Sequence, residues 1–208
     1  MAATPYDHNV FIHRPFDRAY RPILYALVFA VHDCGFRARS TLEIDGSGAV
    51  RIENIYGLIL ESRFGIHDIS RTDLDEENGL PRFNMPLELG VFLGATRFGR
   101  GRQREKRSLI LDREPYRYQK YLSDIAGQDI RSHGGDPEEA IGRVRDWLDS
   151  SPVEPEVTRP GGAKIAERYR AFMRELPDIC RELHLDPEEL TFNNFTTFVV
   201  EWLKVRPV

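Results

Sequence analysis

The sequence predicts an α/β protein whose parallel sheet is covered by helices and followed by a helical C-terminal extension. Short β-rich runs alternate with apolar or amphipathic helical segments over the first 150 residues. Strands separated by helices pair in parallel as βαβ units, which gives a three-layer domain. Beyond residue 162 the patterns are helical. We therefore expect an α/β domain over residues 1–150, a linker over 151–162 and a helical C-terminal extension over 163–208.

The first strand is expected at His8–His13, where the sequence reads HNVFIH. A helix follows over 22–31, because Pro22 suits a first helical turn, in which its missing N–H would have no intrahelical partner. This segment is apolar on nearly all sides, which predicts a deeply buried helix that ends at Gly35. A second strand is expected within residues 36–41.

Two more helices and two more strands follow in alternation. They are expected at 49–62 (helix), 63–70 (strand), 86–98 (helix) and 106–112 (strand). The first of these helices has an apolar stripe at helical spacing, formed by Ile52, Ile55, Ile59 and Leu60. The last strand is short, β-rich and bounded by charge. This alternation is the pattern that predicts the parallel sheet.

The chain is less regular after Asp112. Residues 114–135 mix aromatic and basic side chains and are expected to hold a helix and a short extended piece. A clear helix follows over 136–150, since Asp136 can cap it and Pro137 suits its first turn. Asp186 and Pro187 repeat this cap chemistry in the extension, which we expect to pack on the α/β domain or on a second subunit.

Composition limits the function classes. The chain has 208 residues, is 41% hydrophobic and 30% charged, and is long enough for one good core. Its net charge of -4 argues against a general polyanion binder, so nucleic acid is not an expected partner. The longest apolar run, residues 22–31, is too short to span a bilayer, so no membrane partner is expected. Cys34 and Cys180 fit buried, reduced thiols in a cytoplasmic protein, and no Cys/His cluster has the spacing of a metal site.

Polar side chains follow two strands of the predicted sheet. Ligands of parallel α/β sheets bind in the crevice beyond the carboxyl ends of the strands. There we expect Arg14 and Arg71 to contact phosphate. Phe16 is expected to stack on a base, and Asp68 and Ser70 to hold ribose hydroxyls.

The helix over 86–98 carries one carboxylate, Glu88, in an apolar segment. A carboxylate suits cleavage of an N-glycosidic bond, because positive charge builds on the sugar ring as the base departs. We expect Leu87, Leu89 and Phe92 to shield Glu88, and the lower dielectric would strengthen its attraction for the cation.

The segments FIHRPFD and RFGIHDISRTDLDEENGLPRFNMPLELGVFLGA together resemble the nucleoside 2-deoxyribosyltransferase family and its Toll/interleukin-receptor (TIR)-like bacterial relatives. In the transferases a first strand leads into a Pro-containing turn, a later strand ends in an aspartate, and a Glu-x-Gly carries the nucleophile. Pro15-Phe16, Asp68 and Glu88-Leu89-Gly90 match these landmarks in order. The resemblance covers roughly Asn9 to Asp112, about half of the chain.

The resemblance implies a three-layer flavodoxin-like fold and cleavage of NAD or a related nucleotide or nucleoside, with Glu88 as nucleophile or cation stabiliser. Met85 would line the base pocket with Phe16, and Asn84 would bond the sugar. FNMPLELG replaces the usual Asp-x-Gly-Thr approach to the glutamate, which favours a TIR-like NAD-cleaving member, often a component of antiviral defence. No cofactor is implied, with NAD as a possible substrate. We expect a homo-oligomer formed through the helical C-terminal extension or the α/β domain.

Simpler interpretations stay open for the same residues. Glu88 could lie on the exposed edge of its helix, and Asp68 could be only a turn or cap residue. Alternation points His67 away from Asp68, which favours a structural histidine with satisfied hydrogen bonds. His133 could approach the crevice from another strand end.

Two other function classes also stay open. The fold could serve a non-catalytic module that binds a nucleotide signal or drives assembly, because fold alone does not decide function. The basic segment over residues 97–107 could contact nucleic-acid phosphates, although a solvated loop is the simpler interpretation.

Overall fold

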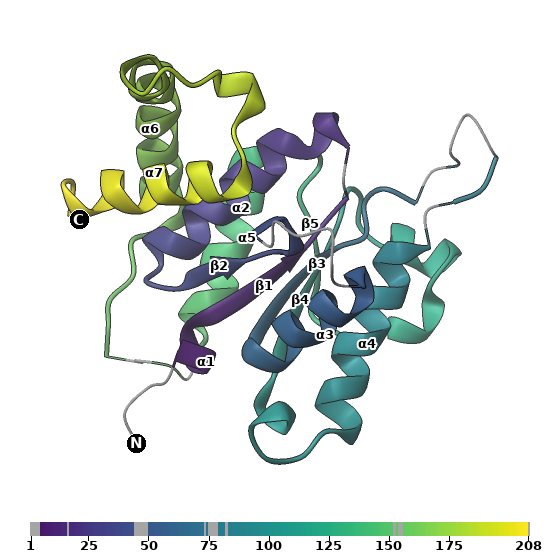
Figure 1. The fold of residues 1–208 in the computed structure, drawn as a ribbon. Helices are drawn as coiled ribbons and strands as arrows, with labels where there is room; N and C mark the ends of the chain where they lie inside the picture. The colour runs from purple at the N-terminus through teal and green to yellow at the C-terminus, as the bar shows by residue number, and fades with distance from the viewer. Residues whose placement is uncertain are drawn as a thin grey trace.

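The protein is a parallel α/β sheet with helices on both faces, as Figure 1 shows. The computed structural model describes residues 5–15, 17–43, 50–72, 74, 79–81, 83–151, 153 and 156–207. Five strands pair in the order β2-β1-β3-β4-β5, and every pair is parallel. This is the strand order of flavodoxin-like folds, so the predicted fold class is confirmed.

The strands are β1 (Asn9–His13), β2 (Arg37–Arg39), β3 (Phe64–Asp68), β4 (Arg107–Asp112) and β5 (Ile130–Ser132). The α-helices are α1 (Pro5–His8), α2 (Arg21–Asp33), α3 (Arg51–Glu61), α4 (Asn84–Phe98), α5 (Pro137–Asp149), α6 (Gly162–Glu182) and α7 (Phe192–Lys204). Short 3₁₀ turns are η1 (Arg18–Tyr20), η2 (Thr41–Glu43), η3 (Gly101–Glu105), η4 (Arg117–Lys120), η5 (Ser123–Ile125) and η6 (Pro187–Glu189). The expected order of strands and helices is confirmed, with ends that differ by a few residues, except that the 3₁₀ turns η4 and η5 replace the helix expected within residues 114–135.

Alternation along the strands assigns side chains to the two faces of the sheet. Val10, Ile12, Phe64 and Ile66 share one hydrophobic cluster with α2 and α5. Phe11 points to the other face and packs with Ile55, Ile59 and Phe92 of α3 and α4. Both faces of the sheet are therefore covered by helices and shielded from water, which explains why β1, β3 and β4 are mostly apolar.

The C-terminal helices α6 and α7 lie beyond α2, on the side of the sheet away from α3 and α4 (Figure 1). Their apolar residues, among them Phe172, Phe195 and Trp202, belong to the same hydrophobic cluster as α2 and α5. Tyr25 of α2 stacks on Phe195 with ring centroids 3.6 Å apart. The expectation that the extension packs on the α/β domain is confirmed. The segment before α6 is also packed, because Arg159 is buried and donates to the carbonyl oxygens of Cys34 and Val153.

Helix ends follow the expected local chemistry. The Asp136 side chain accepts a hydrogen bond from the Glu138 N–H, and Asp186 does the same for Glu188. Gly35 adopts a φ of +83°, a conformation that suits glycine, and its N–H bonds the His32 carbonyl at the end of α2. Cys34 and Cys180 are buried free thiols.

Two expectations about packing are wrong. Leu60 is 52% exposed, so it lies outside the apolar stripe of α3. Leu87 is 58% exposed, because Met85, Glu88, Leu89 and Phe92 form the buried face of α4 and Leu87 lies opposite. The basic segment over residues 97–107 is exposed or half-buried, as expected for a solvated segment, except at Lys106. Lys106 is buried, and its ammonium group donates to the carbonyl oxygens of Ile59 and Ser62.

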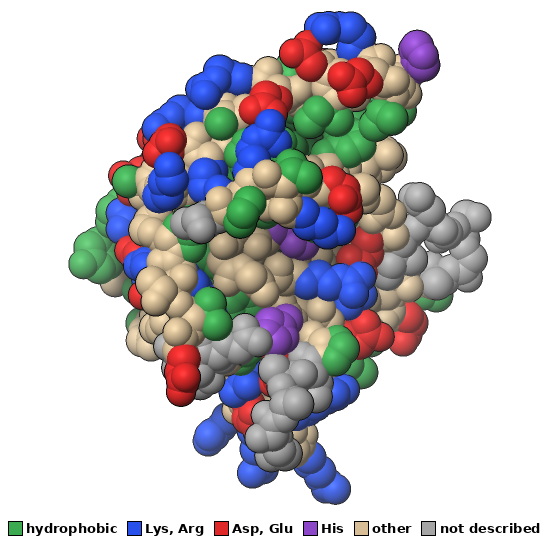
Figure 2. Space-filling view, turned by 90° about the vertical axis from the view of Figure 1, so that its left-hand side faces the viewer, with side chains coloured by type: hydrophobic (Ala, Val, Ile, Leu, Met, Phe, Trp, Pro, Cys, Tyr) green, Lys and Arg blue, Asp and Glu red, His purple; other side chains and the backbone are tan. Residues whose placement is uncertain are grey.

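The face shown in Figure 2 mixes basic and acidic side chains with apolar ones. Within the part of the chain that the structure describes, no helix has the length and apolar composition needed to cross a bilayer.

Candidate functional site

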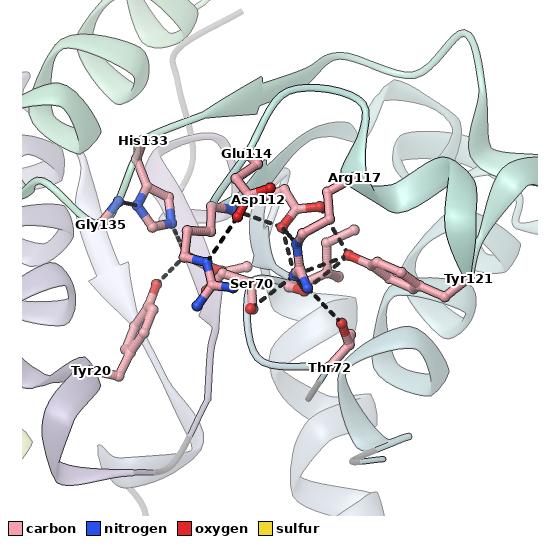
Figure 3. Close-up of polar contacts among 12 residues, drawn as sticks. Tyr20, Ser70, Thr72, Asp112, Glu114, Arg117, Tyr121, His133 and Gly135 are labelled. Atoms are coloured by element: carbon pink, nitrogen blue, oxygen red, sulfur yellow. Dashed lines mark hydrogen bonds and ion pairs between the residues drawn. The ribbon is translucent and has the colours of Figure 1, made fainter. Parts of the chain in front are cut away.

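Asp68 ends β3 at the carboxyl edge of the sheet and gathers hydrogen bonds from three elements. It is fully buried. Its Oδ2 accepts from the Tyr20 hydroxyl at 2.5 Å and lies 3.0 Å from His133 Nε2, while its Oδ1 accepts from the Ser70 N–H at 2.8 Å. Figure 3 shows Tyr20, His133 and Ser70 near one another at this edge of the sheet. Burial alone would raise the pKa of Asp68, but hydrogen bonds from His133, Ser70 and Tyr20 outweigh it and lower the pKa.

The hydrogen bonds of His133 assign its tautomer. The Gly135 N–H donates to His133 Nδ1 at 3.0 Å, in a turn where Gly134 and Gly135 both have positive φ. Nδ1 is therefore an acceptor, and Nε2 carries the proton that it donates to Asp68. Both ring nitrogens are engaged, so His133 locks Asp68 to the end of β5 and has no nitrogen left to serve as a base.

Asp112 ends β4 and forms a second polar centre beside the first (Figure 3). Its carboxylate accepts from Arg117 Nε at 2.8 Å and from the Tyr121 hydroxyl at 2.9 Å. The Arg117 guanidinium also donates to the carbonyl oxygens of Ile69 and Ser70 and to the Thr72 hydroxyl. Arg117 thus fixes the chain that leaves β3 to the end of β4.

Glu88 points at the end of β1 from α4. Its Oε2 lies 2.8 Å from His13 Nε2, and the side chains of Glu88 and His13 are only 4% and 2% exposed. Leu89 and Phe92, which shield it as expected, are buried on the same helix face. The interpretation that Glu88 lies on the exposed edge of α4 is wrong.

His67 lies beside His13 on this face, where the two residues are paired in the register of β1 and β3. Its ring is 5.7 Å from that of His13 and 4.7 Å from that of Phe92. Its orientation away from Asp68 is confirmed. The expectation of satisfied hydrogen bonds is wrong, because neither ring nitrogen has a partner among the described residues. Burial, with smaller effects of His13 and Lys106, lowers the pKa of His67 well below its usual value.

The structure brings only some of the expected binding residues to the Asp68 centre. The Ser70 N–H contacts Asp68, as expected if Asp68 closes a turn. Arg71 forms an ion pair with Asp17 at 3.0 Å instead of facing the crevice alone. Arg14 is buried and donates to the Pro15 carbonyl, and burial lowers its pKa. Phe16 lies outside the described residues.

The expected residues of α4 divide between core and surface. Met85 is 3% exposed and packs with Ile69, Leu89 and Ile110, so it is a core residue. Asn84 is exposed at the first position of the helix. Glu88 is the residue of this group that faces another polar side chain at the carboxyl edge.

Asp68 and Glu88 approach the carboxyl edge from opposite faces of the sheet. Asp68 has the same parity as Phe64 and Ile66, which face α2 and α5, whereas His13 and Glu88 lie on the α3–α4 face. We expected both carboxylates to face one bound sugar. In the described part of the chain, Asp68 and Glu88 do not contact each other.

Sequence reasoning missed Tyr20, Asp112, Arg117 and Tyr121. Asp112 could have been found from the sequence, because it ends β4 in the same way that Asp68 ends β3. The other three lie in short 3₁₀ turns or next to them, where no periodic pattern marks which side chains turn inward.

The fold and these polar centres define a class, a parallel α/β protein with a polar carboxyl edge. No protein-family model matches the chain, and neither the curated proteins nor the solved structures give a significant match. Among the described residues, no group of His, Cys, Asp and Glu is arranged to hold a metal ion.

Proposed function

We propose that the protein cleaves the N-glycosidic bond of NAD or a related nucleotide or nucleoside, with Glu88 as the reacting carboxylate. The observation that carries the proposal is a buried glutamate at the carboxyl ends of the strands, whose Oε2 lies 2.8 Å from His13 Nε2. Ligands of this sheet architecture bind at that edge. A role as an effector in antiviral defence would follow from depletion of NAD.

The chemistry needs few groups. In NAD the nicotinamide nitrogen is positively charged, so the electron pair of the breaking C–N bond neutralises it and no acid is required. Positive charge passes to the sugar ring, where the Glu88 carboxylate stabilises the cation or forms an ester with the anomeric carbon. Water then adds its oxygen to that carbon, displacing the Glu88 carboxylate where the ester has formed, and the Glu88–His13 pair accepts the released proton.

The low dielectric around Glu88 supports this assignment. Leu89 and Phe92 exclude water from one side, so the attraction between a carboxylate and a nearby cation is stronger than in bulk solvent. Asp68 is a weaker candidate because Tyr20, His133 and Ser70 already occupy its oxygens.

The second candidate function is a non-catalytic module that binds a nucleotide signal. This function is favoured by the burial of Glu88, whose side chain is only 4% exposed, as suits a structural ion pair. In this case a nucleotide binds to the chain and stays intact.

Incubation of the protein with a panel of NAD and nucleosides, read by mass spectrometry, separates the two functions. The proposal predicts release of the free base from at least one member of the panel. Because assembly can be needed to complete a pocket, the incubation is run at low and high protein concentration. Binding measured by calorimetry without base release at either concentration supports the sensor and contradicts the enzyme.

A further inference from the structure

Two cavities adjoin along the open β5 edge of the sheet. One, of about 320 Å³, runs along β5 and is lined by Tyr116, Tyr118 and Ile130 among others. The second, of about 590 Å³, lies between the C-terminal half of α4 and the chain before β5. Gln128 lines both cavities, so they lie next to each other, and we name the pair the β5 groove. Each volume is in the range of small-molecule sites, roughly 300–1,000 Å³.

One end of the β5 groove offers an aromatic surface. Tyr116 has φ +59°, which is uncommon for a residue with a side chain, and is 72% exposed. A strained backbone that holds an aromatic ring in solvent is not explained by core packing, and such strain tends to occur at ligand sites. Tyr118 and Ile130 supply an apolar inner wall. This end suits a planar aromatic ring.

The other end is cationic. Arg97 and Arg104 line the second cavity, and within the described part of the chain neither guanidinium forms an ion pair with a carboxylate. Arg104 Nε donates to the Gly99 carbonyl oxygen at 3.0 Å, which orients the side chain without neutralising it. Unneutralised guanidinium groups bind phosphate well because their N–H groups match its oxygens.

We propose that the β5 groove binds a nucleoside phosphate, with the base against Tyr116 and the phosphate at Arg97 and Arg104. Glu114 lines the base end and is mostly exposed, so its carboxylate can accept a hydrogen bond from the amino group of adenine, cytosine or guanine. Glu88 lines neither cavity, so this site is separate from the proposed glycosidic chemistry.

Calorimetry on the full chain with adenosine monophosphate, uridine monophosphate, adenosine and inorganic phosphate tests the proposal. Adenosine monophosphate binds most tightly, and Tyr116→Ala weakens it by roughly 5- to 100-fold, the range of one base stacked on an aromatic side chain. Tyr116→Phe retains binding because it keeps the ring. The Arg97→Gln/Arg104→Gln double variant lowers affinity for adenosine monophosphate to that of adenosine and removes its salt dependence.

Matched controls exclude general effects. Tyr56→Ala removes an exposed tyrosine from α3, and Arg37→Gln removes an exposed arginine from β2. Both control variants are expected to bind adenosine monophosphate as tightly as the wild type does. Tyr116→Gly relieves the backbone strain, so it folds at least as stably and still loses binding. Adenosine monophosphate binding that survives Tyr116→Ala and the arginine double variant overturns the proposal. So does a failure of every nucleotide to bind, or binding of a single-stranded oligonucleotide alone.

Discussion

His13 and Glu88 face each other across the interface between the sheet and α4, with 2.8 Å between His13 Nε2 and Glu88 Oε2. The pair lies on the α3–α4 face, whereas the Asp68 centre lies on the face covered by α2 and α5. The His13–Glu88 pair and the Asp68 centre are therefore separate polar groups at the carboxyl edge, and the proposed chemistry belongs to the His13–Glu88 pair.

The His13–Glu88 contact predicts coupled stabilities. His13→Gln and Glu88→Gln each remove one side of this buried 2.8 Å contact and are expected to cost about 1–3 kcal/mol of unfolding free energy, because the other polar side chain stays buried. The double variant costs less than the sum, because no unpaired partner remains. Urea unfolding of the four proteins measures the coupling, and strictly additive losses would show that the two side chains do not interact.

Replacing Gly65 by alanine is predicted to destabilise the protein, whereas replacing Gly57 is predicted to stabilise it. A Cβ at Gly65 would lie 2.6 Å from His67 Nε2 and 2.7 Å from a ring carbon of Phe92, whereas one at Gly57 meets nothing within 4 Å. Gly65→Ala is expected to lower the unfolding free energy by about 1–3 kcal/mol through overpacking. Gly57→Ala, inside α3, should raise it by about 0.5–1 kcal/mol. Thermal unfolding of both variants checks the opposite signs, and equal effects would contradict the packing described here.

The buried His67 is expected to make the folded protein less stable at acidic pH. Its pKa in the folded protein is well below 6.5, so between the two values the unfolded chain binds the extra proton and the unfolding free energy falls as the pH falls. This loss is about 1.4 kcal/mol for each pH unit below 6.5 until the folded pKa is reached. The pKa of His67 is lowered chiefly by burial, with smaller effects of His13 and Lys106.

His67→Leu removes this dependence. Between pH 6.5 and 5 the unfolding free energy of the wild type should fall more than that of the variant. His32, whose pKa is lowered to about 4 by burial and by Arg37, acts in the same direction and is unchanged by the substitution. Urea midpoints at the two pH values are the measurement, and parallel pH profiles would refute the assignment.

Arg117 is predicted to be the polar residue on which the carboxyl edge depends most. Arg117→Lys keeps the charge but cannot reach Asp112, Ile69, Ser70 and Thr72 together, and it should cost about 2–4 kcal/mol. Lys164→Ala breaks an exposed ion pair with Glu167 and should change the unfolding free energy by less than about 0.5 kcal/mol. A similar small effect at Arg117 would mean that its contacts are dispensable.

The fold could be predicted because its signals are local. Apolar runs such as Val10–Ile12 and the Asp136-Pro137 cap mark strand and helix without knowledge of their neighbours. The orientation of α4 could not be predicted in the same way. Leu87, Leu89 and Phe92 are apolar on several sides of the helix, so only packing against β1 and β3 decides that Glu88 turns inward and Leu87 outward.

The site was harder to predict because its contacts join residues far apart in sequence. Tyr20, Asp68 and His133 meet through three separate elements, and the short turns that hold Arg117 and Tyr121 carry no periodic signal. The resemblance marked Asp68 and Glu88, but pattern alone could not reveal that strand alternation places them on opposite faces.

The proposed function depends on the Glu88 carboxylate, which stabilises the sugar cation or bonds to it as the glycosidic bond breaks. The most direct measurement is the rate of nicotinamide release from NAD by the wild type, Glu88→Gln and Glu53→Gln, which changes an exposed glutamate of α3. We expect Glu88→Gln, still folded by circular dichroism, to lose at least about 10³-fold in rate, while Glu53→Gln retains the wild-type rate. Nicotinamide release by Glu88→Gln at the wild-type rate would contradict the account.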